Sequence, residues 1–193
     1  MARIIRKFTR QVPHWQPRVA PVRLEDATPE QHEALKITPS NTKVSDYMLV
    51  LAHDPESLAA RSPLFNAVMY DKGGLDRAGR EIGAIGASIV NHCVYCAAVH
   101  AQRHVQLTGD SAVTDSIFAA GPEAELGLRD QAMFDFSVRL AATPPAVGPG
   151  DLQALRDAGL DEGEIADLIL ASAMFGWANR LMHVLGDPVR EPG

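Results

Sequence analysis

The two cysteines of this chain lie three residues apart, in the stretch 91–100 (NHCVYCAAVH). Two cysteines placed at random would have this separation in roughly one chain in a hundred, so the spacing indicates a shared purpose. On a helix, residues three and four apart share a face, which places Cys93 beside Cys96 and Cys96 beside His100. The spacing therefore predicts one cluster of two thiols and an imidazole.

Such a cluster suits thiol redox chemistry. At a helix start, one sulfur can attack a substrate and the other can resolve the product as an intramolecular disulfide. Free cysteine is only a few per cent ionised at pH 7, so the surroundings of the attacking sulfur must lower its pKa. The positive end of a helix dipole acts on a first-turn sulfur, and His100 can accept the proton of Cys96. Glu81 lies next to the apolar segment 82–90 and is the candidate carboxylate that holds the imidazole, because a buried acid needs a partner.

A metal site is an alternative for the same residues. Zinc would need a fourth ligand beyond the two thiols and His100, and His92 or His104 could provide it. Attachment of haem is excluded, because Ala97 rather than a histidine follows the second cysteine.

A purely structural role is a further alternative. The two cysteines would then be small core residues and His100 a packed histidine. Glu81 alone equally suits a surface position near a helix start, and His104 fits a solvated surface better than an extension of the proton relay. Tyr95 either shapes an entrance to the site or packs at a helix interface. Three apolar residues lie close together near the end of the chain: Met174, Phe175 and Trp177. We expect them to pack in the core rather than to line a pocket.

Helix-capping signals recur along the chain, and no convincing run of alternating β-branched residues appears, so the sequence predicts an all-α fold. Thr28 and Asp54 each precede a proline, which is typical of a helix start. Asp76 can cap the next helix, and Asn91 the one that carries the thiols, so that Cys93 lies in a first turn. We expect helices at 29–36, from a cap at 40–42 to 52, from 55 to before 73, and at 77–90, 92–108, 111–120, 129–142, 151–158 and 162–185, with a loop at 143–150.

The thiol-bearing stretch has a weak echo later in the chain. The tripeptide Gly-Leu-Asp occurs at 74–76 and at 159–161, each time followed by a glutamate and, 19 residues after it, by a histidine. A shift of 83 residues superposes the two glutamates and the two histidines and puts Gly176 and Asn179 at the positions of the cysteines. The pattern is compatible with an internal duplication of a helical unit that kept its thiols in one copy, and equally with chance.

Length and composition are those of a globular domain. The chain has 193 residues, of which 46% are hydrophobic and 22% charged, and its formal net charge of −6 argues against a general nucleic-acid binder. Five basic residues lie in the first 21 positions, and no acid precedes Glu25. We therefore divide the chain into a basic arm at 1–21, expected to be a short solvated tail, and a single helical domain at 22–193.

No apolar core of a signal peptide follows the basic residues, and the longest uncharged run, at 82–102, is interrupted by glycines, an asparagine and histidines. That run is a poor bilayer span and a plausible buried helix pair. We expect a cytoplasmic protein with no membrane span.

The pattern of Glu81, eleven residues, Cys93-Val94-Tyr95-Cys96, three residues and His100 resembles the signature of the alkylhydroperoxidase D and carboxymuconolactone decarboxylase superfamily. The segments 27–31, 50–53 and 159–165 resemble its peroxidase-related branch. A more general resemblance of the sequence to the family extends over 22–185. The resemblance implies an all-helical AhpD-like fold and a homo-oligomer: a dimer, trimer or hexamer.

The resemblance also implies roles for the residues. Cys96 would be the peroxide-attacking sulfur, Cys93 the resolving sulfur, and His100 with Glu81 the proton relay. In the best-known members a histidine precedes the second cysteine, and here Tyr95 stands at that position, so one relay member is missing.

We therefore expect a thiol-dependent peroxidase that reduces small hydroperoxides without a metal or flavin cofactor. The resemblance implies a dithiol electron donor, either a lipoyl group or a thioredoxin-like protein. Two alternatives stay open: a carboxymuconolactone decarboxylase-like enzyme acting on a small carboxylate, and a non-enzymatic oligomer that senses oxidation.

Overall fold

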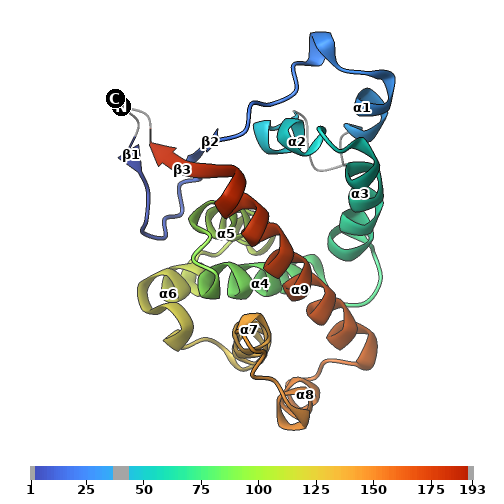
Figure 1. Ribbon diagram of the computed structural model, residues 1–193. Coiled ribbons are helices and arrows are strands. Elements are labelled where there is room, and N and C mark those ends of the chain that lie inside the picture. Colours follow the sequence, from blue (N-terminus) through green and yellow to red (C-terminus); the bar gives the residue numbers. More distant parts are fainter. Residues whose placement is uncertain (1–2, 37–43, 191–193) are drawn as a thin grey trace.

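A computed structural model of the chain describes residues 3–36 and 44–190 (Figure 1). Helices dominate these residues, so the predicted all-α fold is confirmed, with one small sheet added to it. The helices are α1 (Pro29–Ala34), α2 (Asp46–Leu51), α3 (Pro55–Tyr70), α4 (Arg77–Val90), α5 (Val94–Thr108), α6 (Ala112–Ala120), α7 (Leu128–Ala141), α8 (Pro149–Asp157) and α9 (Glu162–Leu185). The 3₁₀ turns η1 (Leu24–Asp26) and η2 (Gly121–Glu123), and the strands β1 (Arg3–Ile4), β2 (His14–Pro17) and β3 (Gly186–Arg190), complete the list.

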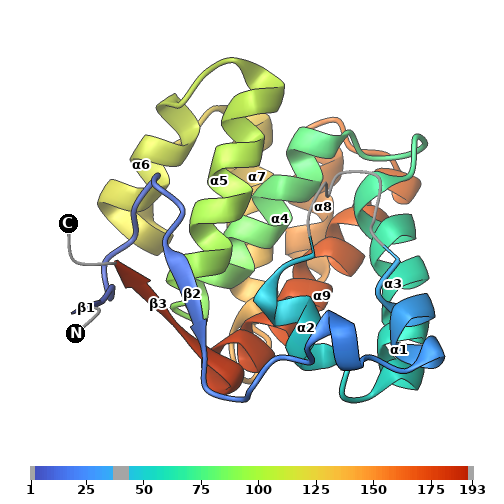
Figure 2. The ribbon, with the colours of Figure 1, turned by 90° about the horizontal axis from the view of Figure 1, so that it is seen from above.

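Helix α4 lies at the centre of the molecule, with α5, α7 and α9 packed around it (Figure 2). Every residue from Gly79 to Ile89 is buried, which is the property of a core helix rather than an amphipathic surface helix. Gly86 allows the closest approach, because a Cβ at this position would lie 2.7 Å from the Cβ of Ser137 on α7. The helix that carries Glu81 is thereby held on several sides.

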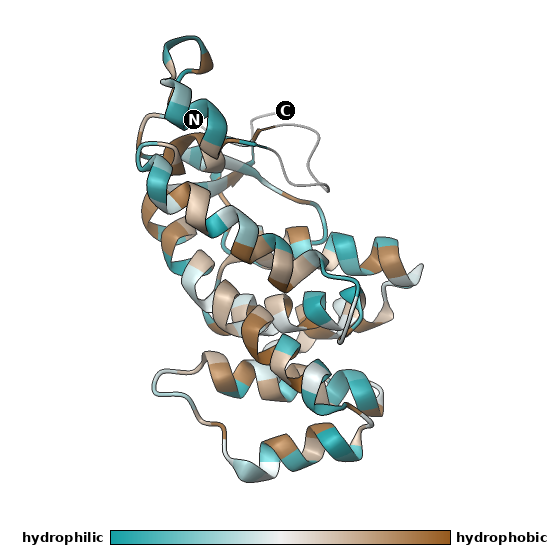
Figure 3. Cartoon of the chain, turned by 90° about the vertical axis from the view of Figure 1, so that its right-hand side faces the viewer, coloured by the Kyte–Doolittle hydropathy of each residue, from teal (hydrophilic) through white to brown (hydrophobic). Residues whose placement is uncertain are grey.

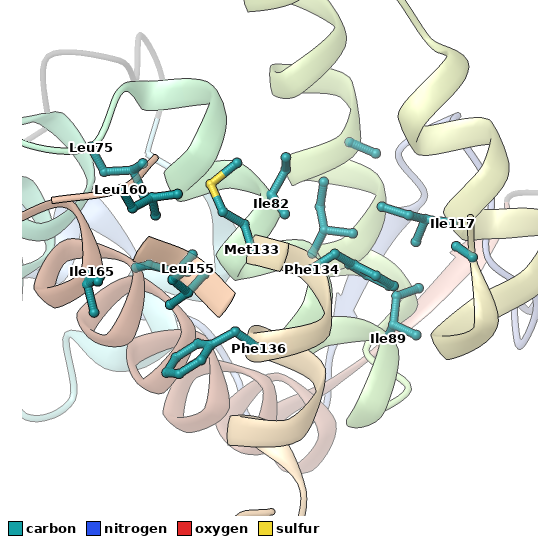
Figure 4. Packing of buried hydrophobic residues seen from close by; sticks show 14 residues of the cluster. Leu75, Ile82, Ile89, Ile117, Met133, Phe134, Phe136, Leu155, Leu160 and Ile165 are labelled. Carbon is teal, nitrogen blue, oxygen red and sulfur yellow. The ribbon is translucent and has the colours of Figure 1, made fainter. Parts of the chain in front are cut away.

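The main hydrophobic core lies between α4 and helices α6 to α9 (Figure 4). Phe134 of α7 is fully buried in it, beside Ile82 and Ile89 of α4 and Ile117 of α6. Close packing of large side chains resists small displacements, so this core fixes the position of α4 relative to its neighbours.

The turn between α4 and α5 differs from the prediction. Asn91 is not an N-cap but ends α4: the N–H groups of His92 and Cys93 bond the carbonyls of Ile89 and Ser88, which is a Schellman turn. His92 occupies the left-handed position of that turn, with φ of 52°. Cys93 is therefore the N-cap of α5 and lies just before its first turn. The prediction failed because asparagine suits both ends of a helix.

Most other helix boundaries agree with those predicted from the sequence. Helices α4 and α9 begin and end as predicted, and Thr28, Asp54 and Asp76 are N-caps. The cap predicted at 40–42 lies outside the described residues, and α2 begins at Asp46 with Ser45 as its N-cap. Helix α8 begins two residues earlier than predicted, at Pro149.

The echoed tripeptides have the same local structure. Gly74 and Gly159 both have positive φ, of 66° and 87°, and Asp76 and Asp161 are both N-caps. Beyond these starts the two stretches differ, because the first breaks into α4 and α5 whereas α9 continues without interruption. An internal duplication stays a prediction.

The amino-terminal arm is not the solvated tail that its charge predicts. Strands β1 and β2 pair antiparallel with β3, in the order β1-β3-β2, so the arm flanks the strand that follows α9 (Figure 1). Trp15 of β2 is only 5% exposed and packs with Val50 and Met182. A Cβ on Gly186 would lie 2.3 Å from an indole carbon of Trp15, so the pairing of β2 with β3 requires glycine at this position. The division of the chain at residue 21 stays a prediction.

Helix α9 is the single helix of the described residues that is long and apolar enough to cross a membrane by length and composition. This is weak evidence, because core helices of soluble proteins pass the same test. Leu168 and Phe175 of α9 are buried in two hydrophobic clusters, and hydrophilic residues are interspersed along the chain (Figure 3). These features fit a soluble protein; a cytoplasmic location stays a prediction.

Candidate active site

The structure brings the two thiols together at the start of α5. The Sγ atoms of Cys93 and Cys96 are 2.9 Å apart, and both residues are buried, with exposed fractions of 3% and 6%. The cysteines are reduced, and their separation exceeds the covalent S–S distance of about 2.05 Å. A movement of about 1 Å would join the sulfurs, so the pair is placed to form a disulfide.

The surroundings of the two thiols separate their pKa values. The hydrogen bond with Cys96 lowers the pKa of Cys93, and the N–H groups of Cys96 and Tyr95 and the side chain of Asn179 add to this effect against the opposing effect of burial. The same contact with Cys93, together with burial, raises the pKa of Cys96 well above its ordinary value. The first thiolate to form is therefore that of Cys93, chiefly because of its contact with Cys96 at the start of α5.

Glu81 and His100 form a buried pair beside the thiols. Glu81 is fully buried; its Oε2 accepts a hydrogen bond from Nδ1 of His100, and its Oε1 accepts one from Nε of Arg77 at 2.7 Å. Burial raises the pKa of Glu81, but the nearby charges and hydrogen bonds of His100 and Arg77 outweigh it, so the pKa lies below its ordinary value. With Nδ1 as the donor to the carboxylate, Nε2 of a neutral His100 is free to accept a proton.

The pairing of Glu81 with His100 is as the sequence predicts, and a surface position for Glu81 is wrong. The predicted contact between His100 and a thiol is not found: within the described residues, no hydrogen bond joins the imidazole to either sulfur. Instead the ring of His100 meets the edge of Phe175, with 4.1 Å between the ring centroids. Phe175 is buried as expected, while Trp177, for which we favoured core packing, is 47% exposed.

Cys96 and His100 line one cavity of about 330 Å³, which we call the Cys96 cavity. Its wall is formed by side chains from α2, α3, α4, α5 and α9. Glu81 lies in the same wall, so a molecule in this cavity can reach a sulfur and the carboxylate-bound imidazole together.

Cys93 lines a different cavity of about 480 Å³, which we call the Cys93 cavity. The amino-terminal arm and β3 form much of its wall, together with His92 and His183. Tyr95 and Met182 line both cavities and stand between them. Tyr95 also packs against the cluster that holds the two cysteines, so the packing alternative is found, and a role at an entrance stays a prediction. The dithiol is flanked by a cavity on each of two sides.

The remaining histidines do not join the cluster. His92 is exposed, and its ring stacks on Phe8 of the arm with 6.1 Å between centroids. His104 is not on the surface as expected but is 3% exposed, and burial lowers its pKa. No group of three histidine, cysteine or carboxylate side chains in the described part of the chain could hold a metal ion.

Sequence reasoning missed two polar neighbours of the site. Arg77 precedes Glu81 by four residues, a spacing that itself indicates an ion pair on a helix. Asn179 is fully buried on α9 and contacts the side chains of Ser88 and Asn91. The weak internal repeat in the sequence did single out Asn179, because the shift of 83 residues gives it the position that corresponds to Cys96.

A comparison with protein families matches residues 55–108 to the Carboxymuconolactone decarboxylase family. This stretch runs from the start of α3 to the end of α5 and includes Glu81, both cysteines and His100. No curated protein matches the chain.

Solved structures share the fold over nearly the whole chain. An uncharacterized peroxidase-related protein from Ralstonia eutropha JMP134, described as an alkylhydroperoxidase AhpD core, is 25% identical, with a TM-score of 0.78 over 92% of this chain and 94% of that one. A peroxidase-related protein from Silicibacter sp. TM1040 is 22% identical, with a TM-score of 0.76 over 93% and 95%. The debrominase Bmp8 is 15% identical, with a TM-score of 0.72 over 86% and 89%. The likeness to the last two concerns the fold alone.

Proposed function

We propose that the chain is a member of the alkylhydroperoxidase D and carboxymuconolactone decarboxylase superfamily, in its peroxidase-related branch, and that it reduces small hydroperoxides with its dithiol. One observation carries the proposal: two reduced sulfurs 2.9 Å apart at a helix start, one of them sharing a cavity with a carboxylate-bound imidazole.

In the first step, the Cys96 sulfur attacks the peroxide. Cys96 is the thiol that lines the cavity with His100, and because the two make no direct hydrogen bond, its proton passes across the shared cavity to Nε2 of the imidazole, whose positive charge Glu81 stabilises. The Cys96 thiolate attacks one oxygen of the O–O bond, which breaks to give a sulfenic acid and an alkoxide. The imidazolium returns the proton to the alkoxide, and an alcohol leaves.

In the second step, Cys93 resolves the sulfenic acid. Its lowered pKa supplies a thiolate that attacks the Cys96 sulfur, forms the disulfide and expels hydroxide, which takes up a proton to become water. The sum is two thiols and one hydroperoxide converted to a disulfide, an alcohol and water. Peroxide attack thus uses the thiol that faces the substrate, and resolution uses the thiol that ionises first.

A dithiol donor then reduces the disulfide from the side of Cys93. A donor thiolate in the Cys93 cavity attacks the Cys93 sulfur, the S–S bond breaks, and Cys96 leaves as a thiolate. The second donor thiol attacks the mixed disulfide and releases Cys93. We propose a lipoyl group or a thioredoxin-like protein as this donor, as the family resemblance implies.

Mass spectrometry of the reduced protein after one equivalent of hydroperoxide tests the proposal. We expect a loss of two hydrogens that dithiothreitol reverses, and stopped-flow traces with a panel of hydroperoxides should show rapid oxidation by at least one of them. A Cys93→Ser, Cys96→Ser double variant is the control and should consume no peroxide. Slow reaction with every hydroperoxide would contradict the proposal and favour the decarboxylase-like or sensing alternative.

The assembly and location are proposed on the same resemblance. We propose a cytoplasmic homo-oligomer, and light scattering coupled to size-exclusion chromatography would give its subunit number. A monomer at micromolar concentration would contradict this part of the proposal without affecting the dithiol chemistry.

A further inference from the structure

The Cys96 cavity contains an arginine with no acidic partner. Arg61 of α3 lines the cavity; its guanidinium lies 4.2 Å from the ring centroid of Phe65, and one of its terminal nitrogens lies 3.7 Å from Sδ of Met48. Its Nε is buried and donates to no atom of the described residues, and no carboxylate of those residues pairs with it. Arg61 is half-buried, and a buried N–H of a charged group without an acceptor is energetically unfavourable, so its presence needs an explanation.

A second unsatisfied group lies in the same cavity wall. The hydroxyl of Tyr47 on α2 is buried and makes no hydrogen bond within the described residues. Tyr47 is close enough to Arg61 and to both cysteines for their charges to act on its pKa, and burial keeps that pKa well above the ordinary value. The hydroxyl is therefore a neutral donor near the thiols that lacks an acceptor.

The charge of the cavity wall is positive. Arg61, Arg77 and Arg103 line it, against one carboxylate, Glu81, which is already bonded to Arg77 and His100. Arg103, like Arg61, has no ion pair within the described part of the chain. Aromatic rings of Phe65, Tyr70 and Phe175 supply the apolar remainder of the wall. Such a lining suits a molecule with an apolar body and one anionic end.

We propose that the Cys96 cavity binds a carboxylate-bearing organic molecule, whose carboxylate accepts hydrogen bonds from the guanidinium of Arg61 and the hydroxyl of Tyr47. The planar guanidinium fits a carboxylate in a bidentate arrangement, and a hydrogen bond to a charged group is stronger than one between neutral groups. The inference rests on the proposed function for its substrate class, a hydroperoxide that carries a carboxylate, and narrows that function from hydroperoxides in general. A volume of about 330 Å³ limits the ligand to a small organic acid.

A matched pair of ligands tests the site without any reaction. The probes are 2-phenylpropan-2-ol and its para-carboxylate, the alcohol products of cumene hydroperoxide and of the corresponding acid. Calorimetry with the reduced protein at pH 7 should show the carboxylate binding about 10- to 100-fold more tightly than the neutral alcohol, because a hydrogen-bonded charge pair in a buried site is worth that much. Equal affinity for the two alcohols would overturn the inference.

Variants assign the preference to particular groups. Arg61→Gln should reduce the preference for the carboxylate to within about threefold, and Tyr47→Phe should weaken carboxylate binding by about tenfold, the usual worth of one hydrogen bond to a charge. Arg180→Gln is the matched control, because Arg180 is exposed on α9, lies outside the wall of the Cys96 cavity and bonds the carbonyl of Gly176. A preference that survives Arg61→Gln would overturn the inference.

Salt dependence keeps the test valid if Arg61→Gln does not fold. Raising the ionic strength should weaken binding of the carboxylate to the wild-type protein and leave the neutral alcohol unaffected. The two proposals can also fail separately. Selective binding of the carboxylate without oxidation of the dithiol by its hydroperoxide would support the anion site and refute the peroxidase. Equally fast oxidation by neutral and anionic hydroperoxides, with equal binding, would support the peroxidase and refute the anion site.

Discussion

The two sides of the dithiol differ in almost every property that matters for thiol chemistry. The Cys96 cavity is walled by helices and contains a buried carboxylate, an imidazole and two guanidinium groups that form no ion pair within the residues that the structure describes. The Cys93 cavity is walled largely by the arm and by β3, and its two histidines are exposed. Two neighbouring sulfurs thereby acquire different tasks, because one faces fixed groups that can move a proton and the other faces a partly exposed channel that a donor can reach.

The largest effect should come from replacing each cysteine in turn. Cys96→Ser should lower the rate of peroxide consumption by about 1,000-fold or more, because the attacking nucleophile is lost. Cys93→Ser should still react once and accumulate a sulfenic acid on Cys96. Trapping with dimedone followed by mass spectrometry would locate the modified residue.

The same experiment shows how this assignment would fail. A sulfenic acid on Cys93 in the Cys96→Ser protein, with none on Cys96 in the other variant, would reverse the roles of the two sulfurs. The lowered pKa of Cys93 favours its thiolate, which is the reason why an attack by Cys93 is the alternative to test.

Glu81→Gln should have the next largest effect, confined to the Cys96 side. Losing the carboxylate weakens the proton acceptor, so the rate of peroxide reduction should fall by about 100-fold.

The same substitution should lower the free energy of unfolding. Because the pKa of Glu81 is lower in the folded than in the unfolded protein, its contribution to stability is present above about pH 4.3 and is lost as the pH falls through the folded-state pKa. Urea unfolding at pH 7 should show a loss of about 1 to 3 kcal/mol.

The pH series provides the check. The stability difference between wild type and Glu81→Gln should shrink as the pH falls from 5 to 3, and a difference that grows over this interval would contradict the assignment. Glu123→Gln, at an exposed carboxylate on η2, is the control and should change neither the rate nor the free energy of unfolding.

Removing residues 1–12 should change the access to Cys93, on the other side of the dithiol. The deletion takes away β1, which lines the Cys93 cavity, and leaves β2 paired with β3. We expect alkylation of Cys93 in a Cys96→Ser background to accelerate by about tenfold, because access limits the reaction of a buried thiol. Peroxide oxidation of the truncated dithiol protein should stay within about twofold of wild type. An equal change in both reactions would mean that the two cavities are not separate routes, and circular dichroism would verify that the helices persist.

The smallest effects concern the pKa values, where the two thiols should move in opposite directions. Cys96→Ala removes the main group that lowers the pKa of Cys93, so that pKa should rise. Cys93→Ala removes the main group that raises the pKa of Cys96, so that pKa should fall, while burial keeps it above the ordinary value. Thiolate absorbance at 240 nm during a pH titration measures both, and shifts of the same sign would contradict the shared hydrogen bond.

The sequence by itself determined the features that depend on local chemistry and spacing. Capping residues such as Asp54 and Asp76 fixed helix starts, because their side chains satisfy N–H groups a few residues away. The three-residue spacing likewise predicted that the thiols would be neighbours. The apolar segment that follows Glu81 predicted that this acid would be buried and would hold His100. Asn91 was misassigned because the same residue type can end a helix as well as begin one.

Only the tertiary structure decided what surrounds the thiols. The burial of His104 and the exposure of Trp177 depend on which helix faces are covered, which no local pattern specifies. Strand pairing turned the arm from an expected tail into a cavity wall, through hydrogen bonds between segments about 170 to 190 residues apart. Arg61 and Tyr47 joined the site in the same way, since α2 and α3 approach α5 only when the chain is folded.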